Sequence, residues 1–214
     1  MLSILCLGVL FAATDGNVDL AAPVKIDVYY ETLCPDSKHF LLTQLRPTYH
    51  TLKDIVEISL VPYGKATEKQ ETDGSYTFTC QHGSKECYGN VIQACAIKHI
   101  NDFDVYSQFI YCMEEVIFTD GPEKAARDCS VNQSLPIDDI LTCAKGNEGM
   151  MLQHASSIQQ GSLDPKLDWV PWVVINNVHT ERIKKLSAKN LFGLVCQTYQ
   201  GTKPEACKLK PIGV

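Results

Sequence analysis

The hydrophobic and polar positions in the first part of the chain predict a strand, a helix and a second strand. Residues 24–30, "VKIDVYY", alternate apolar and polar side chains and are rich in Val, Ile and Tyr, as strands are. Residues 54–64 also have strand character and close on a proline and a glycine. Between them, apolar residues recur at helical spacing, at Phe40, Leu41, Leu45 and Tyr49. We therefore expect a βαβ unit in which residue 34 lies between the first strand and the helix.

The remaining chain predicts a helical block followed by one strand and one helix. Residues 65–88 are polar and rich in cysteine, which favours a loop stapled by disulfides. Residues from about 89 to 161 show helical apolar spacing in four stretches separated by Pro or Gly, "NVIQACAIKHI", "VYSQFIYCMEEVI", "PIDDILTCAKG" and "GMMLQHASSIQQG". Residues 170–177 return to strand character, and a last helix is expected from Ser187, as its N-cap, to Tyr199. No repeat or interdomain linker is visible, so the sequence predicts one α/β domain.

The amino-terminal residues predict export from the cytosol. Residues 1–16 read as a signal peptide, with cleavage between Ala13 and Gly16. Their apolar run of about twelve residues is too short to span a bilayer, which takes about 20; the alternative is a buried N-terminal strand or helix. No later segment is apolar enough to cross a membrane, so we expect a lumenal or secreted domain over 17–214. The N-x-S sequon at Asn132 is a candidate glycosylation site.

Composition and charge narrow the class of protein. The chain of 214 residues is 45% hydrophobic and 21% charged, which excludes a disordered or fibrous protein. Its formal net charge is −6, and no cluster of Lys and Arg is visible, so nucleic acid is not an expected partner.

The cysteine content points to an oxidising compartment. The chain has ten cysteines, far more than a cytosolic protein of this size normally carries. Cys6 leaves with the signal peptide, so an odd number remains and one thiol is free or bonded to another molecule. Cys34 is the expected free thiol, because it lies apart from the others at the start of a helix. The other eight can form four disulfides, of which only Cys196–Cys207 is favoured by closeness; they are Cys80, Cys87, Cys95, Cys112, Cys129, Cys143, Cys196 and Cys207.

Cys34 occupies the position of a redox nucleophile, between a strand and the amino end of a helix. Pro35 suits the first helical turn, and the helix terminus favours a thiolate, whereas the Asp36 carboxylate opposes it. The partner thiol of a dithiol site would follow three residues later, where this chain has Ser37. A serine hydroxyl cannot break a mixed disulfide, although it can donate a hydrogen bond to a thiolate. The alternatives are an unreactive leftover at Cys34 and a plain helix-forming residue at Ser37.

One stretch, "CQHGSKECYGNVIQAC", resembles the signature of the gamma-interferon-inducible lysosomal thiol reductase family. The family pattern C-Q-H-G-x-x-E-C-x-x-N-x-x-x-x-C is matched at Cys80, Gln81, His82, Gly83, Glu86, Cys87, Asn90 and Cys95. Similarity extends over 24–207 through "YYETLCPDS", "LVPYG", "CMEE", "VPWVVIN" and "CQTYQG". The C-x-x-C of the family's reductases is C-x-x-S here. The resemblance implies a soluble, glycosylated enzyme that reduces protein disulfides in acidic endosomes and lysosomes and needs no cofactor.

The order of the elements and this resemblance both imply a thioredoxin-like fold with a helical insertion at about 89–161. That fold places a cis-proline before its third strand, facing the redox cysteine, and Pro171 is where this chain offers one. Trp169 and Trp172 flank the proline. They either pack in the core or form an apolar wall for unfolded substrate beside Cys34.

The cysteines and the histidine of the signature could also bind zinc. The spacing of Cys80, His82, Cys87 and Cys95 matches no common zinc site, and an oxidising compartment favours disulfides, so we expect no metal. His82 and Glu86 are then expected to make structural hydrogen bonds in a disulfide-bonded loop, although their place in the signature leaves a functional role open.

The sequence therefore predicts a thiol–disulfide oxidoreductase of the lysosome or the extracellular space. Its catalytic residues would be Cys34, Ser37 and Pro171, and its substrates disulfide-containing unfolded proteins. Because the site has no second thiol, cysteine or glutathione would act as co-substrate and resolve the adduct on Cys34. Two alternatives stay open: a non-catalytic secreted binding protein of the same fold, and a disulfide isomerase, which needs only one attacking thiol.

Overall fold

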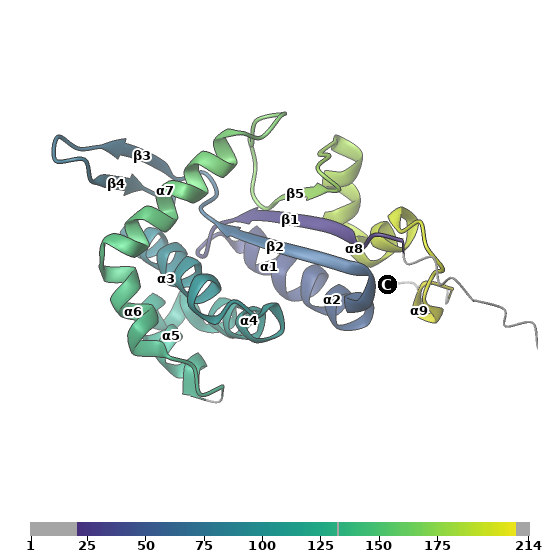
Figure 1. The fold of residues 1–214 in the computed structure, drawn as a ribbon, viewed down its shortest axis with the longest axis horizontal. Helices are drawn as coiled ribbons and strands as arrows, with labels where there is room; N and C mark the ends of the chain where they lie inside the picture. Colours follow the sequence, from purple (N-terminus) through teal and green to yellow (C-terminus); the bar gives the residue numbers. More distant parts are fainter. Residues whose placement is uncertain (1–20, 132, 209–214) are drawn as a thin grey trace, which may run out of the picture.

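The computed structural model describes residues 21–131 and 133–208 (Figure 1). The expected signal peptide, 1–16, and the sequon at Asn132 lie outside the described residues. The described chain has an α/β fold in which a three-stranded sheet has helices along it and at both of its ends (Figure 1). Within these ranges, no helix combines the length and the apolar character that a membrane crossing requires.

The sheet has the strand order β2-β1-β5, formed by Val24–Tyr30 (β1), Val56–Pro62 (β2) and Trp172–Ile175 (β5). β1 lies in the middle, parallel to β2 and antiparallel to β5. All four residues of β5 are buried, as expected for a short apolar run in a covered sheet.

A helical crossover joins the two parallel strands, as parallel pairing requires. It consists of α1 (Pro35–Phe40), one π-helical turn (Leu41–Leu45), α2 (Arg46–Leu52) and a 3-10 turn (Lys53–Ile55). Its apolar stripe packs with β1 in the main core, through Phe40, Leu41, Leu45, Leu52, Val24, Ile26 and Val28. The βαβ unit predicted from the periodicity is confirmed.

A block of helices follows at one end of the sheet (Figure 1). It comprises α3 (Ser84–Ile100), α4 (Phe103–Asp120), α5 (Pro122–Val131), α6 (Ile137–Lys145) and α7 (Asn147–Gly161). The block begins at Ser84, earlier than the predicted start near residue 89. Gly83 has a φ of 85°, so the chain turns sharply into the helix there, and Gly89 continues the helix rather than starting it.

Residues 65–88, expected to form a loop, contain a hairpin, and the expectation was wrong in this respect. β3 (Thr67–Gln70) pairs antiparallel with β4 (Tyr76–Thr79), and the hairpin projects beyond the helical block (Figure 1). β3 is polar throughout, and in β4 the alternation of Tyr76 and Phe78 with threonines spans only four residues. Contact with α7 supports them, because Tyr76 stacks on His154 with 3.8 Å between the ring centroids.

The last long helix, α8 (Glu181–Thr198), also begins earlier than predicted, and α9 (Glu205–Lys208) follows it. Thr180 is the N-cap, since its hydroxyl oxygen accepts the backbone N–H of Ile183 at 3.1 Å. Ser187, the predicted cap, is buried inside the helix. Charged residues dominate the first two turns of α8, where the only apolar side chains that pack against the main core are Ile183 and Leu186, so the apolar spacing is weak there.

The face of the sheet opposite the main core has a small apolar cluster of its own. Tyr29, Val61, Trp172 and Val174 form it, and the leucines of segment 163–167 cover it. Trp172 is 4% exposed. Of the two interpretations offered for this tryptophan, packing in the core is the one the structure supports.

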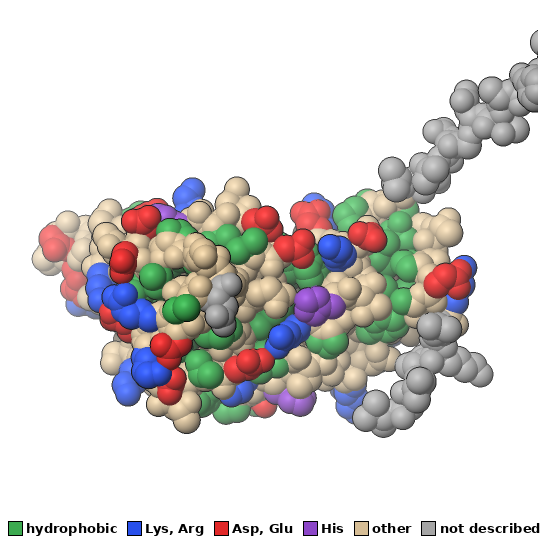
Figure 2. All heavy atoms as spheres, turned by 90° about the horizontal axis from the view of Figure 1, so that it is seen from below, with side chains coloured by type: hydrophobic (Ala, Val, Ile, Leu, Met, Phe, Trp, Pro, Cys, Tyr) green, Lys and Arg blue, Asp and Glu red, His purple; other side chains and the backbone are tan. Residues whose placement is uncertain are grey.

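Charges of both signs are mixed on the surface. Figure 2 shows Lys and Arg side chains next to Asp and Glu, with apolar side chains between them. Lys124 of α5, for example, pairs with Asp120 at the end of α4 and with Asp128 of α5. On the face in Figure 2, neither sign of charge forms a continuous field that would steer a charged polymer.

Candidate active site around Cys34

Cys34 lies in a tight turn between β1 and α1. Its N–H donates to the carbonyl of Glu31 at 3.3 Å, which closes the turn. Its own carbonyl accepts the N–H of Lys38 at 3.0 Å and begins the helix, with Pro35 in the first turn. The Cys34 residue is 8% exposed. The thiol therefore sits at the amino end of the crossover helix, where backbone N–H groups favour an anion.

Cys34 is the free thiol among the described residues. The eight cysteines that the sequence assigned to disulfides are bonded as Cys80–Cys87, Cys95–Cys143, Cys112–Cys129 and Cys196–Cys207. The last pair is the one favoured by closeness in the sequence; the pairing of the other six was open. Because the other described sulfurs of cysteine are all bonded, thiol chemistry falls to Cys34.

The Ser37 side chain points inward, three residues after Cys34. It is fully buried, and its hydroxyl oxygen accepts the N–H of Glu31 at 3.3 Å. Within the described parts of the chain, no hydrogen bond joins Ser37 to the Cys34 sulfur, so the expected donation to a thiolate has no counterpart in this geometry. The hydroxyl instead helps to hold the turn that carries Cys34.

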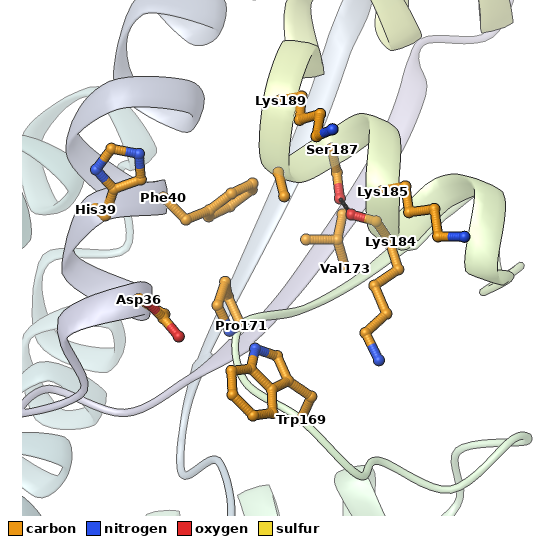
Figure 3. A pocket seen from close by; sticks show the side chains of 11 residues that line it. Asp36, His39, Phe40, Trp169, Pro171, Val173, Lys184, Lys185, Ser187 and Lys189 are labelled. Atoms are coloured by element: carbon orange, nitrogen blue, oxygen red, sulfur yellow. Dashed lines mark hydrogen bonds between the residues drawn. The ribbon is translucent and has the colours of Figure 1, made fainter.

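A pocket of about 350 Å³ opens beside α1, and Pro171 forms part of its wall (Figure 3). The bond before Pro171 is cis. Figure 3 shows Asp36 and Phe40 of α1 facing Pro171 and Trp169 across the pocket. Trp169 is 51% exposed, so it is available as an apolar surface. The far side of the pocket is formed by β5 and α8, through Val173, Lys184, Lys185, Ser187, Ala188 and Lys189.

The signature cysteines are unavailable as zinc ligands, because all of them are bonded in disulfides. His82 contacts Glu86 instead, with 2.5 Å between Nδ1 and Oε2, and Glu31 Oε2 lies 3.7 Å from the same nitrogen. Two ligand atoms on a tetrahedral zinc ion lie about 3.3 Å apart. The His82–Glu86 distance is therefore that of a hydrogen bond rather than of two ligands sharing an ion.

Two buried glutamates near the Cys34 turn, Glu31 and Glu114, were not among the site residues predicted from the sequence. Glu31 lies in the Cys34 turn itself, and burial raises the pKa of its carboxyl. Glu114 of α4 is also fully buried, and its Oε1 accepts Nε2 of Gln93, whose Oε1 accepts the hydroxyl of Tyr30. Burial raises the pKa of Glu114 to about 8. The sequence did carry one sign of such buried glutamates: each lies inside a mainly apolar stretch, Glu31 in "VYYETL" and Glu114 in "CMEEVI".

Gly89 of α3 allows Thr32 of the Cys34 turn to pack directly on the helix. A Cβ at Gly89 would lie 2.5 Å from Thr32 Oγ1 and 3.2 Å from Ile117 Cδ1, and both neighbours are buried. We therefore expect Gly89→Ala to lower the free energy of unfolding by about 1–2 kcal/mol. Gly161→Ala at the end of α7 is the control, because nothing lies within 4 Å of the added Cβ. Urea unfolding without reductant measures both variants, and equal stabilities would contradict this prediction.

The chain is similar in sequence to known proteins. Residues 25–133 match the family model described as gamma interferon inducible lysosomal thiol reductase. The gamma-interferon-inducible lysosomal thiol reductase of Carassius auratus is 41% identical over 192 residues, covering 87% of this chain and 73% of the relative. The protein of the same name from Mus musculus is 36% identical over 188 residues, covering 86% and 72%. GILT-like protein 1 of Drosophila melanogaster is 36% identical over 200 residues, covering 87% and 79%.

Solved structures resemble the fold. The oxidoreductase DsbA from Xylella fastidiosa superposes with a TM-score of 0.52 over 84% of this chain and 92% of its own, at 15% identity. A thioredoxin-like oxidoreductase from Silicibacter pomeroyi gives 0.53 over 78% and 85%, at 10% identity. At such identities the likeness shows the fold alone. The predicted thioredoxin-like α/β fold with a helical insertion, stapled by disulfides, is confirmed.

Proposed function

Because this chain belongs to the gamma interferon inducible lysosomal thiol reductase family, we propose that its thiol–disulfide oxidoreductase activity runs through one sulfur, that of Cys34. The observation that carries the proposal is the state of the cysteines. Cys34 heads α1 as a free thiol, whereas eight other cysteines form disulfides. Ser37 stands where a second thiol would be, and its hydroxyl is engaged by the N–H of Glu31.

The reaction begins when the Cys34 thiolate attacks one sulfur of a substrate disulfide. The substrate S–S bond breaks, Cys34 becomes bonded to one substrate sulfur, and the other leaves as a thiolate that takes a proton from solvent. The thiolate of cysteine or glutathione then attacks the Cys34 sulfur of this mixed disulfide and releases the second substrate thiol. The small thiol is now bonded to Cys34. A second small thiolate attacks the sulfur of this bound small thiol, so that Cys34 leaves as a free thiolate and the two small thiols leave as a disulfide. Two small thiols therefore supply the electrons that reduce the substrate.

The pocket beside α1 fits an extended segment of an unfolded substrate. Phe40, Trp169 and Pro171 give it an apolar wall, and Phe40 lies on α1, six positions after the attacking Cys34 (Figure 3). Such a wall stabilises a bound apolar side chain by about 25 cal/mol per Å² of surface removed from water. Unfolded proteins expose apolar side chains next to their disulfides, so we infer disulfide-containing unfolded proteins as the substrates.

The proposed place of action is the lysosome or the extracellular space. The similar proteins of Carassius auratus and Mus musculus are named as lysosomal. Disulfides at eight cysteines fit a protein that passes through an oxidising secretory route. Cleavage of a signal peptide near residue 16, glycosylation at Asn132 and a single mature domain over 17–214 belong to the same proposal. The mass of the secreted protein, before and after glycosidase treatment, tests them.

Turnover should require both Cys34 and an added small thiol. We expect the wild type to reduce a denatured disulfide protein at about pH 5 when cysteine is supplied, because the small thiol resolves each adduct. When cysteine is withheld, covalent adducts on Cys34 should accumulate and be visible by mass spectrometry. Cys34→Ser should form no adduct and show no turnover. Alkylation of the unreduced wild type should label Cys34 alone among the nine cysteines that follow the expected signal peptide.

Two other outcomes would assign the protein to another class. If Cys34→Ser matches the wild type in adducts and turnover, the oxidoreductase proposal fails and a non-catalytic binding protein takes its place. If the wild type rearranges a scrambled disulfide protein without net loss of disulfides, the activity is that of an isomerase.

A further inference from the structure

One face of α3 is polar where an apolar face would be expected. Glu86, Asn90 and Gln93 are spaced i, i+4 and i+7, which places them on one side of the helix, and all three are fully buried. That spacing ordinarily carries apolar core residues. Burying polar groups costs free energy unless they are hydrogen-bonded, so the partners of these side chains indicate what the face does.

All three residues contact the short segment that leads into the active-site turn. Asn90 Oδ1 accepts the N–H of Thr32 at 3.0 Å, and the backbone carbonyl of Glu86 accepts the Thr32 hydroxyl at 3.2 Å. Gln93 Oε1 accepts the hydroxyl of Tyr30. The amino-terminal half of α3, which lies beside the sheet in Figure 1, therefore binds both the backbone and the side chains of this segment.

Glu31, in the middle of the segment, is held from two further sides. Its Oε1 accepts the N–H of Lys65, and its Oε2 lies 3.7 Å from Nδ1 of His82, which itself pairs with Glu86. Glu86, His82 and Lys65 are the charged groups that face Glu31. Burial raises the pKa of the Glu31 carboxyl and Glu86 adds to this, whereas Lys65 and His82 oppose it. A proton taken up by Glu31 at acidic pH removes the repulsion between the two buried carboxylates.

We propose that Glu31, Glu86 and Asn90 are positioning residues for Cys34. Together with Thr32 they form what we call the α3 clamp, which touches no substrate and acts by fixing the turn that carries the attacking sulfur. Attack on a disulfide needs the thiolate in line with the S–S bond, and a misplacement of about 1 Å can slow such a step about a hundredfold. The inference rests on the proposed function, since it assumes that Cys34 attacks disulfides.

The test compares two reactions of the same sulfur. Alkylation by iodoacetamide and attack on a denatured disulfide protein both use the thiolate, so the ratio of exchange rate to alkylation rate cancels thiolate supply and reports positioning. Asn90→Ala and Thr32→Val should lower this ratio about tenfold or more, because each removes one bond of the α3 clamp. Thr32→Ser keeps the hydroxyl and should stay within about twofold of the wild type.

Gln153→Ala is the matched control. Gln153 of α7 is an equally buried amide whose Nε2 donates to the carbonyl of Pro62 at 3.1 Å, outside the turn. The Gln153→Ala variant should lose about as much stability as Asn90→Ala, but its ratio of exchange rate to alkylation rate should equal that of the wild type. A matching drop in the ratio for Gln153→Ala and Asn90→Ala, or a wild-type ratio in Thr32→Val, would overturn the clamp.

The Glu31 contact is tested by a conservative pair. Glu31→Gln keeps an acceptor oxygen for the N–H of Lys65, so it should stay within about twofold of the wild-type ratio. Glu31→Ala should lower the ratio as Asn90→Ala does. If Glu31→Ala keeps the wild-type ratio, Glu31 is not a positioning residue.

Failure of the proposed function would look different from failure of the clamp. If the wild type is alkylated at Cys34 but never exchanges with protein disulfides, the oxidoreductase proposal fails. The α3 clamp then still predicts faster alkylation in Asn90→Ala than in Gln153→Ala, because a released turn exposes a residue that is now 8% exposed. Equal alkylation rates in these two variants would overturn the clamp as well.

Discussion

Replacing Ser37 with cysteine should allow the protein to release its covalent adducts without an added thiol. A thiol at this position lies one helical turn from Cys34, so its attack on the mixed disulfide becomes intramolecular. Well-oriented intramolecular reactions reach effective molarities of about 10⁵ M, and even a poorly aligned thiol with an effective molarity of about 1 M exceeds a millimolar small thiol about a thousandfold. We therefore expect Ser37→Cys to release adducts about a thousandfold faster than the wild type, with reductant needed only to reopen the new disulfide.

Two variants separate the added sulfur from the lost hydroxyl. Ser37 is fully buried and accepts the N–H of Glu31, so Ser37→Cys should lose about 1 kcal/mol of stability through a weaker acceptor. Ser37→Ala loses the same hydrogen bond without gaining a thiol and should keep the slow release. Ser107→Cys places a second buried thiol on α4 and should keep it too. Single-turnover mass spectrometry measures the release; equal rates in Ser37→Cys and Ser37→Ala would refute the monothiol explanation.

Raising the pH from about 5 to about 8 should lower the free energy of unfolding by about 3 kcal/mol, mainly through Glu114. Burial raises the pKa of this carboxyl from its ordinary value of 4.5 to about 8, Glu86 adds to the shift, and Gln93 and Lys38 oppose it. Between these two values the folded protein keeps a proton that the unfolded chain has lost. The stability is therefore fully present below about pH 4.5 and is lost as the pH rises through 8. Glu31, whose pKa is also raised, acts in the same direction.

Glu114→Gln should remove most of this pH dependence. Glutamine has the shape of the neutral acid and bears no charge at any pH, so the variant should match the wild type near pH 5 and exceed its stability near pH 8. Glu115→Gln is the control on the same helix, because Glu115 is exposed and pairs with Arg46 at 2.8 Å. Glu115→Gln should leave the change of the free energy of unfolding with pH as it is in the wild type. Urea unfolding at several pH values measures both variants, and a wild-type slope in Glu114→Gln would show that Glu114 is not its source.

Local patterns in the sequence determined the βαβ unit and the place of the nucleophile. These patterns are strand alternation, helical spacing and a cysteine followed by proline. Each depends only on residues close together in the sequence, so the local backbone conformation that it predicts is the one found in the fold. The odd number of cysteines, together with the isolation of Cys34, likewise indicated which thiol would be free. The hairpin was missed because β3 is polar and the alternation in β4 spans only four residues, whereas part of its support comes from α7, which is distant in the sequence.

The tertiary structure alone decided which distant groups meet at Cys34. Asn90 reaches Thr32 across 58 positions, and Gln93 reaches Tyr30 across 63. The disulfide partners of six cysteines and the raised pKa of Glu31 and Glu114 depend in the same way on packing between elements. Burial and long-range hydrogen bonds arise only when segments far apart in the sequence are brought together, and no local pattern in the chain specifies them.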